Sequence, residues 1–148
     1  MSLPERLAAA SEVRSWTGSI PLHYEYTAGV AGEAFLRGLK DGKILAGYCP
    51  ECGSAALPAR TYCVDCFSPT TRFVRTGPIG VVRAVAKKET AGGETVSFGF
   101  IEFPGTKGGI IHRLLPGARA GSKVRAVFKP RAQRAGAVSD IVGFERAG

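Results

Sequence analysis

The C-terminal half of the chain alternates apolar and polar residues in short stretches separated by glycine-rich turns. The alternation is clearest at residues 123–129, where Val124, Ala126 and Phe128 fall on the inward face of an extended strand. Similar stretches predict strands at residues 81–88, 95–103, 110–115, 124–128 and 138–144. No helical period interrupts them, so they indicate a small closed barrel, and we expect an OB-fold. A five-stranded sandwich is the alternative.

Aromatic residues sit on both faces of the predicted strand 95–103. Phe98 and Phe100 share one face, whereas Phe103 falls on the other. We expect Phe98 and Phe100 to point into the barrel core, which leaves Phe103 as the outward aromatic side chain of this strand.

Residues 28–40 show a helical period instead. Apolar side chains recur there at near-helical spacing and form one stripe, which predicts a helix. Thr27 is a candidate N-terminal cap, and Asp41-Gly42 ends the helix because glycine accepts the left-handed conformation common at helix ends. Extended segments follow at residues 43–48, 56–62 and 72–76.

The N-terminal segment gives weaker signals. Residues 1–16 carry an alanine run that favours a helix, with a frayed arm as the alternative. Residues 17–26 are expected to be extended, because Pro21 and the neighbouring aromatic residues disfavour a helix. His23 lies in this stretch and is interpreted as a surface side chain.

Composition agrees with one ordinary domain, or a small domain with appendages. The chain has 148 residues, 45% of them hydrophobic, with 20 Gly and 9 Pro. No apolar run approaches the roughly 20 residues of a membrane span. The net charge of +8 favours an anionic partner: nucleic acid, an acidic protein or a phosphorylated cofactor. Nothing resembles a signal peptide, so we expect a cytoplasmic location.

The four cysteines form two CxxC pairs, Cys49/Cys52 and Cys63/Cys66, with ten residues between the pairs. Two intervening residues let each turn aim both sulfurs at one point, and Gly53 allows the positive φ that such a turn often needs. Four thiolates at about 2.3 Å from one ion form the closed tetrahedral shell of structural zinc. A four-sulfur site leaves no open position for a substrate, so the predicted role is structural.

Two other interpretations of the cysteines stay open. A redox CxxC motif needs only one pair, usually at a helix start within a βαβ pattern. Two disulfides need an oxidising compartment. The separation of ten residues is also shorter than the fifteen to twenty typical of zinc ribbons, which leaves room only for a short hairpin.

Two stretches carry a resemblance to a known family. One runs from Tyr26 to Ile44 (YTAGVAGEAFLRGLKDGKI) and continues into the two CxxC turns; the other comprises GSKVRAVFKP at 121–130 and RAGAVSDI at 134–141. Residues 17–145 thereby resemble the acyl-CoA-associated proteins with a rubredoxin-like zinc ribbon and a C-terminal OB-fold. Pro58-Ala59-Arg60 with Tyr62-Cys63 is similar to the family's Pro-Pro-Arg-x-x-Cys segment, with Ala59 in place of the second proline.

The resemblance implies a mainly β protein with an N-terminal helical segment. We expect an arm and helix at 1–42, the zinc ribbon at 43–76 and the OB-fold at 77–148. Members of the family are accessory subunits of thiolases, hydroxymethylglutaryl-CoA synthases or acyl-CoA hydratases. The implied function is a non-catalytic zinc-binding subunit, most simply of a thiolase-type enzyme, which assists acyl-CoA binding and assembly in a hetero-oligomer.

A shared CoA thioester would need cations for its phosphates, because arginine forks and lysine ammonium groups suit them. Basic residues cluster in sequence around the expected ribbon–barrel junction. The candidate CoA-binding residues are Arg60, Arg72, Arg75, Lys87 and Lys88.

The apolar stripe of the predicted helix is a candidate partner interface. The ribbon beside it looks too small to bury a long stripe, and a closed barrel needs no helix. The candidate interface residues are Tyr24, Tyr26, Phe35, Leu36 and Leu39.

We expect no catalysis by the isolated chain. All cysteines are assigned to the ribbon, and neither His23 nor His112 has a neighbouring carboxylate in sequence to orient it. The alternative function is single-stranded nucleic-acid binding, because zinc ribbons and OB-folds both bind nucleic acids and the chain is basic. A single outward aromatic, Phe103, offers little stacking surface for it.

Overall fold

The computed structural model describes residues 18–148, so the helix signal at residues 1–16 lies outside the described residues. Within these described residues, one α-helix and nine strands follow an extended N-terminal segment. They are α2 (Gly29–Lys40), β1 (Leu45–Cys49), β2 (Ser54–Leu57), β3 (Arg72–Arg75), β4 (Gly80–Glu89), β5 (Thr95–Glu102), β6 (Thr106–Gly108), β7 (Ile110–Leu114), β8 (Lys123–Phe128) and β9 (Ile141–Arg146).

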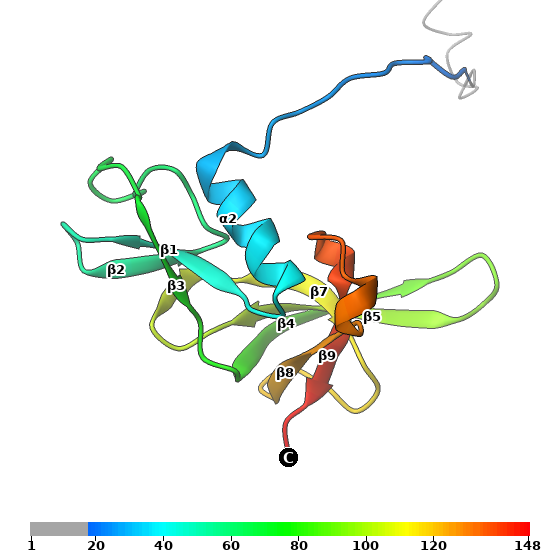
Figure 1. Cartoon of the computed structure of the whole chain (residues 1–148). Helices are drawn as coiled ribbons and strands as arrows, with labels where there is room; N and C mark the ends of the chain where they lie inside the picture. The colour runs from blue at the N-terminus through cyan, green and yellow to red at the C-terminus, as the bar shows by residue number, and fades with distance from the viewer. Residues whose placement is uncertain (1–17) are drawn as a thin grey trace, which may run out of the picture.

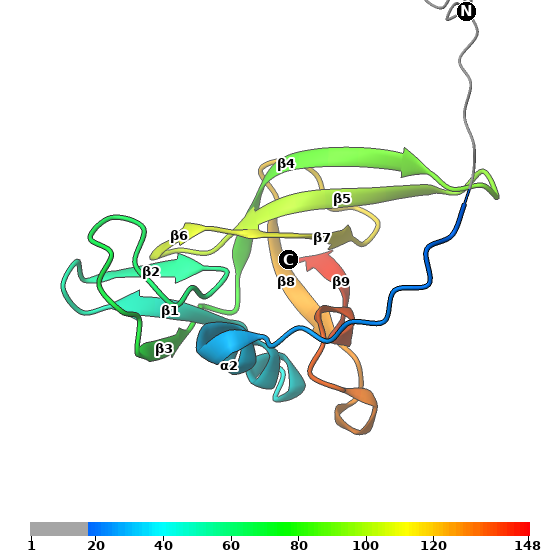
Figure 2. The ribbon, with the colours of Figure 1, turned by 90° about the horizontal axis from the view of Figure 1, so that it is seen from above.

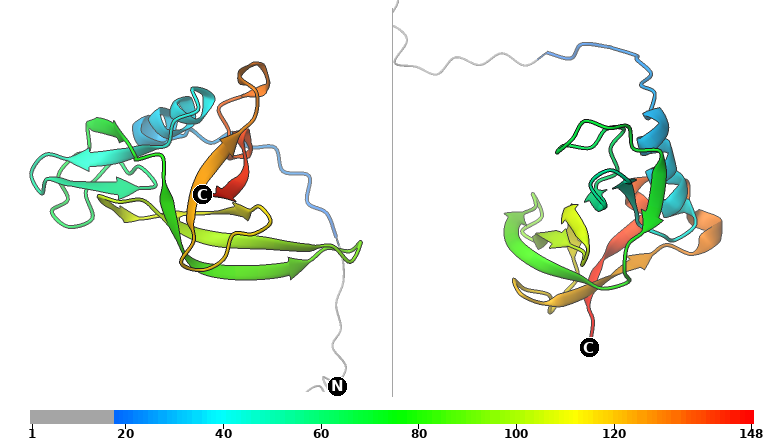
Figure 3. Two further views of the ribbon diagram at one scale, coloured as in Figure 1. Left: turned by 90° about the horizontal axis from the view of Figure 1, so that it is seen from below. Right: turned by 90° about the vertical axis from the view of Figure 1, so that its left-hand side faces the viewer.

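The strands form two bodies that lie side by side (Figure 1). The ribbon sheet has the order β3-β1-β2-β6, and the barrel closes in the order β4-β5-β7-β9-β8. The predicted five-stranded barrel after a ribbon is thereby confirmed. Helix α2 lies against the ribbon and near the C-terminal part of the barrel, as the view from below in Figure 3 shows.

Two predicted strands have different bounds. Residues 58–62 do not continue β2, since Pro58 lacks the N–H that a strand ladder needs. Residues 138–140 form a 3₁₀ turn, and the last strand starts only at Ile141. The predicted cap is also wrong: Ala28 is the N-cap of α2, without a side-chain hydrogen bond, and Thr27 precedes it.

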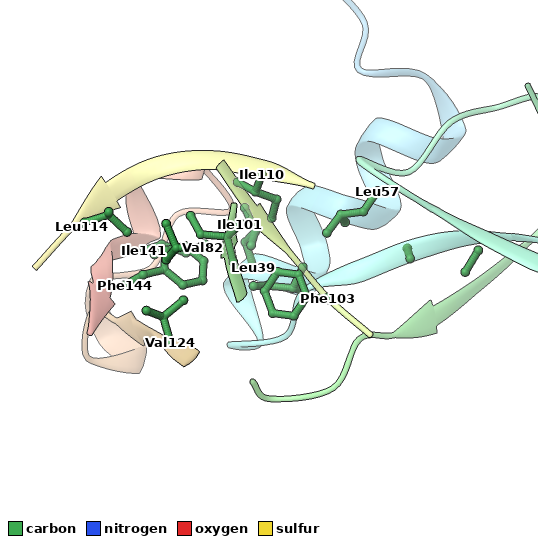
Figure 4. Packing of buried hydrophobic residues seen from close by; sticks show 13 residues of the cluster. Leu39, Leu57, Val82, Ile101, Phe103, Ile110, Leu114, Val124, Ile141 and Phe144 are labelled. Atoms are coloured by element: carbon green, nitrogen blue, oxygen red, sulfur yellow. The ribbon is translucent and has the colours of Figure 1, made fainter. Parts of the chain in front are cut away.

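The apolar stripe of α2 has a partner within the chain. Leu39 is 0% exposed and belongs to the same core cluster as Leu57 of the ribbon and Phe103 of the barrel (Figure 4). Phe35 and Leu36 pack, half-buried, against that cluster. The premise that the chain cannot cover this stripe is therefore wrong, because ribbon and barrel build one continuous core with the helix, and Leu39 has no surface to offer a partner.

The facing of the aromatic residues on β5, and of Phe103 directly after it, is the reverse of the prediction. Phe103 is buried at 3% exposure, whereas Phe98 is 37% exposed and Phe100 is half-buried. The inward face of β5 is built instead from Gly99 and Ile101, which are buried. Gly99 leaves the space that Leu114 fills, since a Cβ there would lie 2.8 Å from the Leu114 side chain.

A short strand that the sequence pattern did not predict joins the two bodies. Strand β6 follows β5 of the barrel and pairs in parallel with β2 of the ribbon, with Gly108 opposite Leu57. Figure 2 shows β6 reaching alongside β2 from the β5 side. Three residues between glycines carry too little alternation to reveal a strand.

Candidate metal centre and junction cavity

The two CxxC turns end in matching backbone conformations. Gly53 follows Cys52 with φ of +62°, as predicted, and Phe67 follows Cys66 with φ of +60°. A hydrogen bond closes the second CxxC turn, in which Phe67 N–H donates to the Cys63 carbonyl at 3.1 Å. Phe67 is a rare left-handed non-glycine residue, so this turn holds its backbone against an intrinsic preference.

The four sulfurs have the spacing of a tetrahedral metal site. They lie within 4.8 Å of one another, with Cys49 Sγ 3.5 Å from Cys66 Sγ and Cys52 Sγ 3.9 Å from Cys63 Sγ. Zinc–sulfur bonds of about 2.3 Å place tetrahedral sulfurs about 3.8 Å apart. No pair is at the roughly 2.05 Å of a disulfide. The residues thus fit zinc, and no second group of three or more metal-binding side chains occurs within residues 18–148.

The protein environment distinguishes the four thiols. Hydrogen bonds from the hydroxyl and the N–H of Ser68 lower the pKa of Cys66 to about 6. The hydrogen bond between Cys52 and Cys66 raises the pKa of Cys52 to about 12. The Ser68 hydrogen bonds therefore favour the thiolate form of Cys66, and zinc binding would displace protons from the other cysteines.

A cation from the barrel lies beside the metal centre. Lys107 of β6 forms an ion pair with Asp65, which lies between the cysteines of the second turn. Asp65 raises the pKa of Lys107, and the charges of Cys52 and Cys63 add to that shift. A zinc ion with four thiolates carries a net charge of −2, so Lys107 offsets part of it.

A cavity of about 180 Å³ opens where ribbon and barrel meet. Its floor is apolar, built from Ile44, Phe103 and Phe128, and its rim carries Lys43, Arg75 and Arg125. The Arg125 guanidinium is held by Glu145 at 2.7 Å. Lys43 and Arg75 have no ion-pair partner within the described part of the chain, so an anion could bind between them and Arg125.

Comparisons with known proteins agree with this architecture. Residues 37–72 match the model of the ChsH2 rubredoxin-like zinc ribbon domain. A Sulfolobus solfataricus protein of unknown function from the DUF35 family superposes with a TM-score of 0.69 and 27% identity, over 84% of this chain and 90% of that one. The chain therefore shares the ribbon-and-barrel architecture of that DUF35 protein. The resemblance noted in the sequence, to acyl-CoA-associated proteins of this architecture, is confirmed.

A second solved structure shares the fold. It is described as an Ltp2–ChsH2(DUF35) aldolase, and it superposes with a TM-score of 0.60 and 14% identity, over 78% of this chain and 93% of that one. No curated protein matches the chain. No helix within residues 18–148 is long and apolar enough to cross a membrane.

The candidate CoA-binding residues of this chain do not gather at one place. Arg75 lines the junction cavity, whereas the Arg72 guanidinium stacks over the Tyr48 ring, 5.2 Å from its centroid. Arg60 is exposed on the loop after β2. Lys87 and Lys88 lie on the part of the β4–β5 hairpin that extends beyond the barrel, far from the ribbon (Figure 1).

Sequence reasoning missed two cavity residues, Lys43 and Arg125. They come from the start of the ribbon and from β8, so no local pattern connects them with Arg75. Both histidines are placed as expected from their sequence context. His23 is exposed, and His112 is a barrel residue whose Nε2 lies 3.3 Å from the Val138 carbonyl oxygen and whose ring contacts Phe144.

Proposed function

We propose that this chain is a non-catalytic zinc-binding subunit of a CoA-dependent enzyme complex, most simply of the thiolase type, which assists acyl-CoA binding and complex assembly. The observation that carries the proposal is the junction cavity, with three cations on its rim and an apolar floor. The phosphates of CoA match the cations, and an adenine ring or acyl chain matches the floor. The family model and the similar DUF35 chain of a two-component aldolase support the assembly role.

The metal centre supports a structural role for zinc within that subunit. Four cysteines fill a tetrahedral shell, so zinc would have no open position to polarise a substrate. We therefore expect the purified chain alone to turn over no acyl-CoA. Thiolysis or hydration by the chain without a partner would contradict this part of the proposal.

The CoA assignment is tested in the complex co-expressed with the partner enzyme subunit. Arg75→Ala should leave assembly intact and raise the KM for acyl-CoA by about tenfold or more, because a hydrogen bond to a charged group contributes about 1.5–3 kcal/mol. Lys88→Ala, on the distant hairpin, is the matched control and should leave KM unchanged. Equal effects of the two substitutions on KM would contradict the assignment of the cavity as a CoA site.

A second candidate function, single-stranded nucleic-acid binding, gains one observation. Phe98 and Phe100 lie beside Arg113 and Ile111 on the outer face of β5 and β7, where the register pairs Phe98 with Arg113 and Phe100 with Ile111. This is the strand pair through which OB-folds bind oligonucleotides. The nearby cations Arg83 and Arg113 face Glu102 and Glu94, which weakens attraction for phosphates. Fluorescence anisotropy with a labelled oligonucleotide, comparing wild type with Phe98→Ala, tests this function.

A further inference from the structure

The segment before α2 carries a large apolar side chain at every second position. Ile20, Leu22, Tyr24 and Tyr26 are 78%, 66%, 69% and 83% exposed. The rings of Tyr24 and Tyr26 meet edge to face with centroids 5.0 Å apart, so both lie on one side of the segment. The intervening positions include the polar residues His23, Glu25 and Thr27. This is the period of a β-strand with one apolar face.

The backbone of this segment is extended apart from a γ-turn at Pro21, and it has no partner strand within the described residues 18–148. Residues 18–28 belong to no helix or strand, and the segment leaves the folded body beside α2 (Figures 1 and 2). One backbone hydrogen bond is made within it, from Leu22 N–H to the Ile20 carbonyl at 2.8 Å. Its apolar face and most of its backbone groups are therefore available to a sheet edge.

The free sheet edges of this chain are poor acceptors for such a strand. In the ribbon sheet one edge is β3, which begins and ends with the exposed arginines Arg72 and Arg75. The other edge is β6, three residues long with an exposed Lys107. The remaining strands close into the barrel, but β4 pairs with β8 only at Gly80 and Val81, so its stretch from Arg83 to Glu89 leaves a third edge. That edge carries the charged residues Arg83, Lys87, Lys88 and Glu89. Short or charged edges are the usual protection against strand addition, so the acceptor belongs to a different protein.

We propose that residues 20–27 add as a β-strand to an exposed sheet edge of the partner enzyme subunit, with Ile20, Leu22, Tyr24 and Tyr26 facing an apolar surface beside that edge. Backbone hydrogen bonds supply affinity, and the four side chains set the register. The inference rests on the proposed function for the existence of the partner. It keeps Tyr24 and Tyr26 of the predicted interface, adds Ile20 and Leu22, and leaves out the buried Leu39 of α2.

The alternation of the segment provides a matched pair of variants. Leu22→Ser with Tyr24→Ser changes the apolar face, whereas His23→Ser with Glu25→Ser changes the polar face of the same segment. The first pair should weaken the affinity for the purified enzyme subunit by at least about 30-fold, the effect of losing one interface hot spot. The second pair should bind as wild type. Glu25→Pro, which removes a backbone N–H, should also weaken binding, and backbone amides of residues 20–27 should exchange more slowly in the complex.

Each result separates the two proposals. If both double-serine variants bind the enzyme subunit as tightly as wild type, strand addition is wrong and the proposed function still stands. If the wild-type chain does not bind the enzyme subunit, both fail. If Leu22→Ser with Tyr24→Ser instead converts a self-associated isolated chain to a monomer by light scattering, the acceptor is a second copy, and the assignment to an enzyme partner is wrong. Unchanged zinc content and thermal unfolding of all variants establish that the fold is intact.

Discussion

Asp140 is 1% exposed beneath the loop that joins β8 to β9, and its carboxylate accepts three backbone hydrogen bonds. The donors are the N–H groups of Ala135 at 3.0 Å, Gly136 at 2.7 Å and Ala137 at 3.0 Å. Burial raises the pKa of Asp140, but these donors lower it by more, so the net shift is downward. One side chain thus fixes the loop that packs against α2, where Gly136 approaches the Leu36 carbonyl.

Replacing this carboxylate should destabilise the protein in a pH-dependent way. Because the folded pKa of Asp140 lies below the unfolded one, its ionised form stabilises the fold above about pH 4. That contribution is lost as the pH falls through the folded pKa. Urea unfolding of wild type and Asp140→Asn should therefore differ most at pH 7, and the difference should shrink as the pH falls from about 4 through the folded pKa of Asp140. Asp41→Asn, at an exposed position, serves as the control, and a difference that does not change with pH would contradict the assignment.

At the residue scale, the sequence predicted groups whose spacing is local. The two CxxC turns and Gly53 could be assigned because each turn is a few residues long. The junction cavity could not, since Lys43, Arg75 and Arg125 meet only after the barrel closes beside the ribbon. The facing of Phe98 was also wrong, because alternation shows that two residues share a face but not which face is inward.

At the scale of elements, the pairing of β6 with β2 depends on the absence of a side chain at Gly108. Its φ is +80°, and a Cβ there would lie 2.3 Å from the Leu57 carbonyl oxygen. Gly105, in the preceding turn, has nearly the same φ of +78° but nothing within 4 Å of the corresponding Cβ. Comparing a substitution at Gly105 with one at Gly108 therefore separates the cost of backbone strain from the cost of steric overlap.

Alanine at these glycines should have unequal effects. Gly105→Ala should lower the free energy of unfolding by about 1–2 kcal/mol, because alanine only has to adopt the left-handed backbone conformation there. Gly108→Ala should cost at least twice as much, because the Leu57 carbonyl can move only if β2 and β6 separate. Denaturant unfolding measures the costs, and amide exchange at Gly108 and Leu57 reports the separation. Equal costs at both positions would mean that β6 is dispensable.

The helix shows why element-level prediction was only partly right. The period and the Asp41-Gly42 ending predicted a helix at residues 28–40, and α2 runs from Gly29 to Lys40. Its environment was predicted wrongly, because the sequence pattern treated ribbon and barrel as separate bodies. Leu39, Leu57 and Phe103 instead share one core. Gly38 lets α2 pack closely against β1, because a Cβ at this position would lie 2.7 Å from the Leu45 side chain.

At the scale of the whole molecule, the shared core and β6 predict that ribbon and barrel unfold together. Zinc binding to four thiolates contributes roughly 10–16 kcal/mol in small zinc domains. Removing the metal with a chelator, or replacing a ligand by Cys66→Ser, should abolish stoichiometric zinc and lower the melting temperature of the barrel as well as the ribbon. Far-UV circular dichroism and NMR signals of β8 and β9 follow the two parts. A barrel that melts unchanged without zinc would show that the bodies are independent.

The parallel pairing of β2 with β6 also has a consequence during synthesis on the ribosome. Strand β6 starts 52 residues after β2, at Thr106 against Ser54. At translation rates of about 5–20 residues per second, that interval lasts roughly 3–10 s. Strand β1 and the first CxxC pair precede this interval, and the second CxxC pair and β3 emerge within it. The nascent ribbon can therefore bind its metal while the outer edge of β2 is still unpaired. An unpaired edge is a site for wrong association between chains. In this protein, the edge of β2 is covered only after the β4–β5 hairpin and β6 have left the exit tunnel.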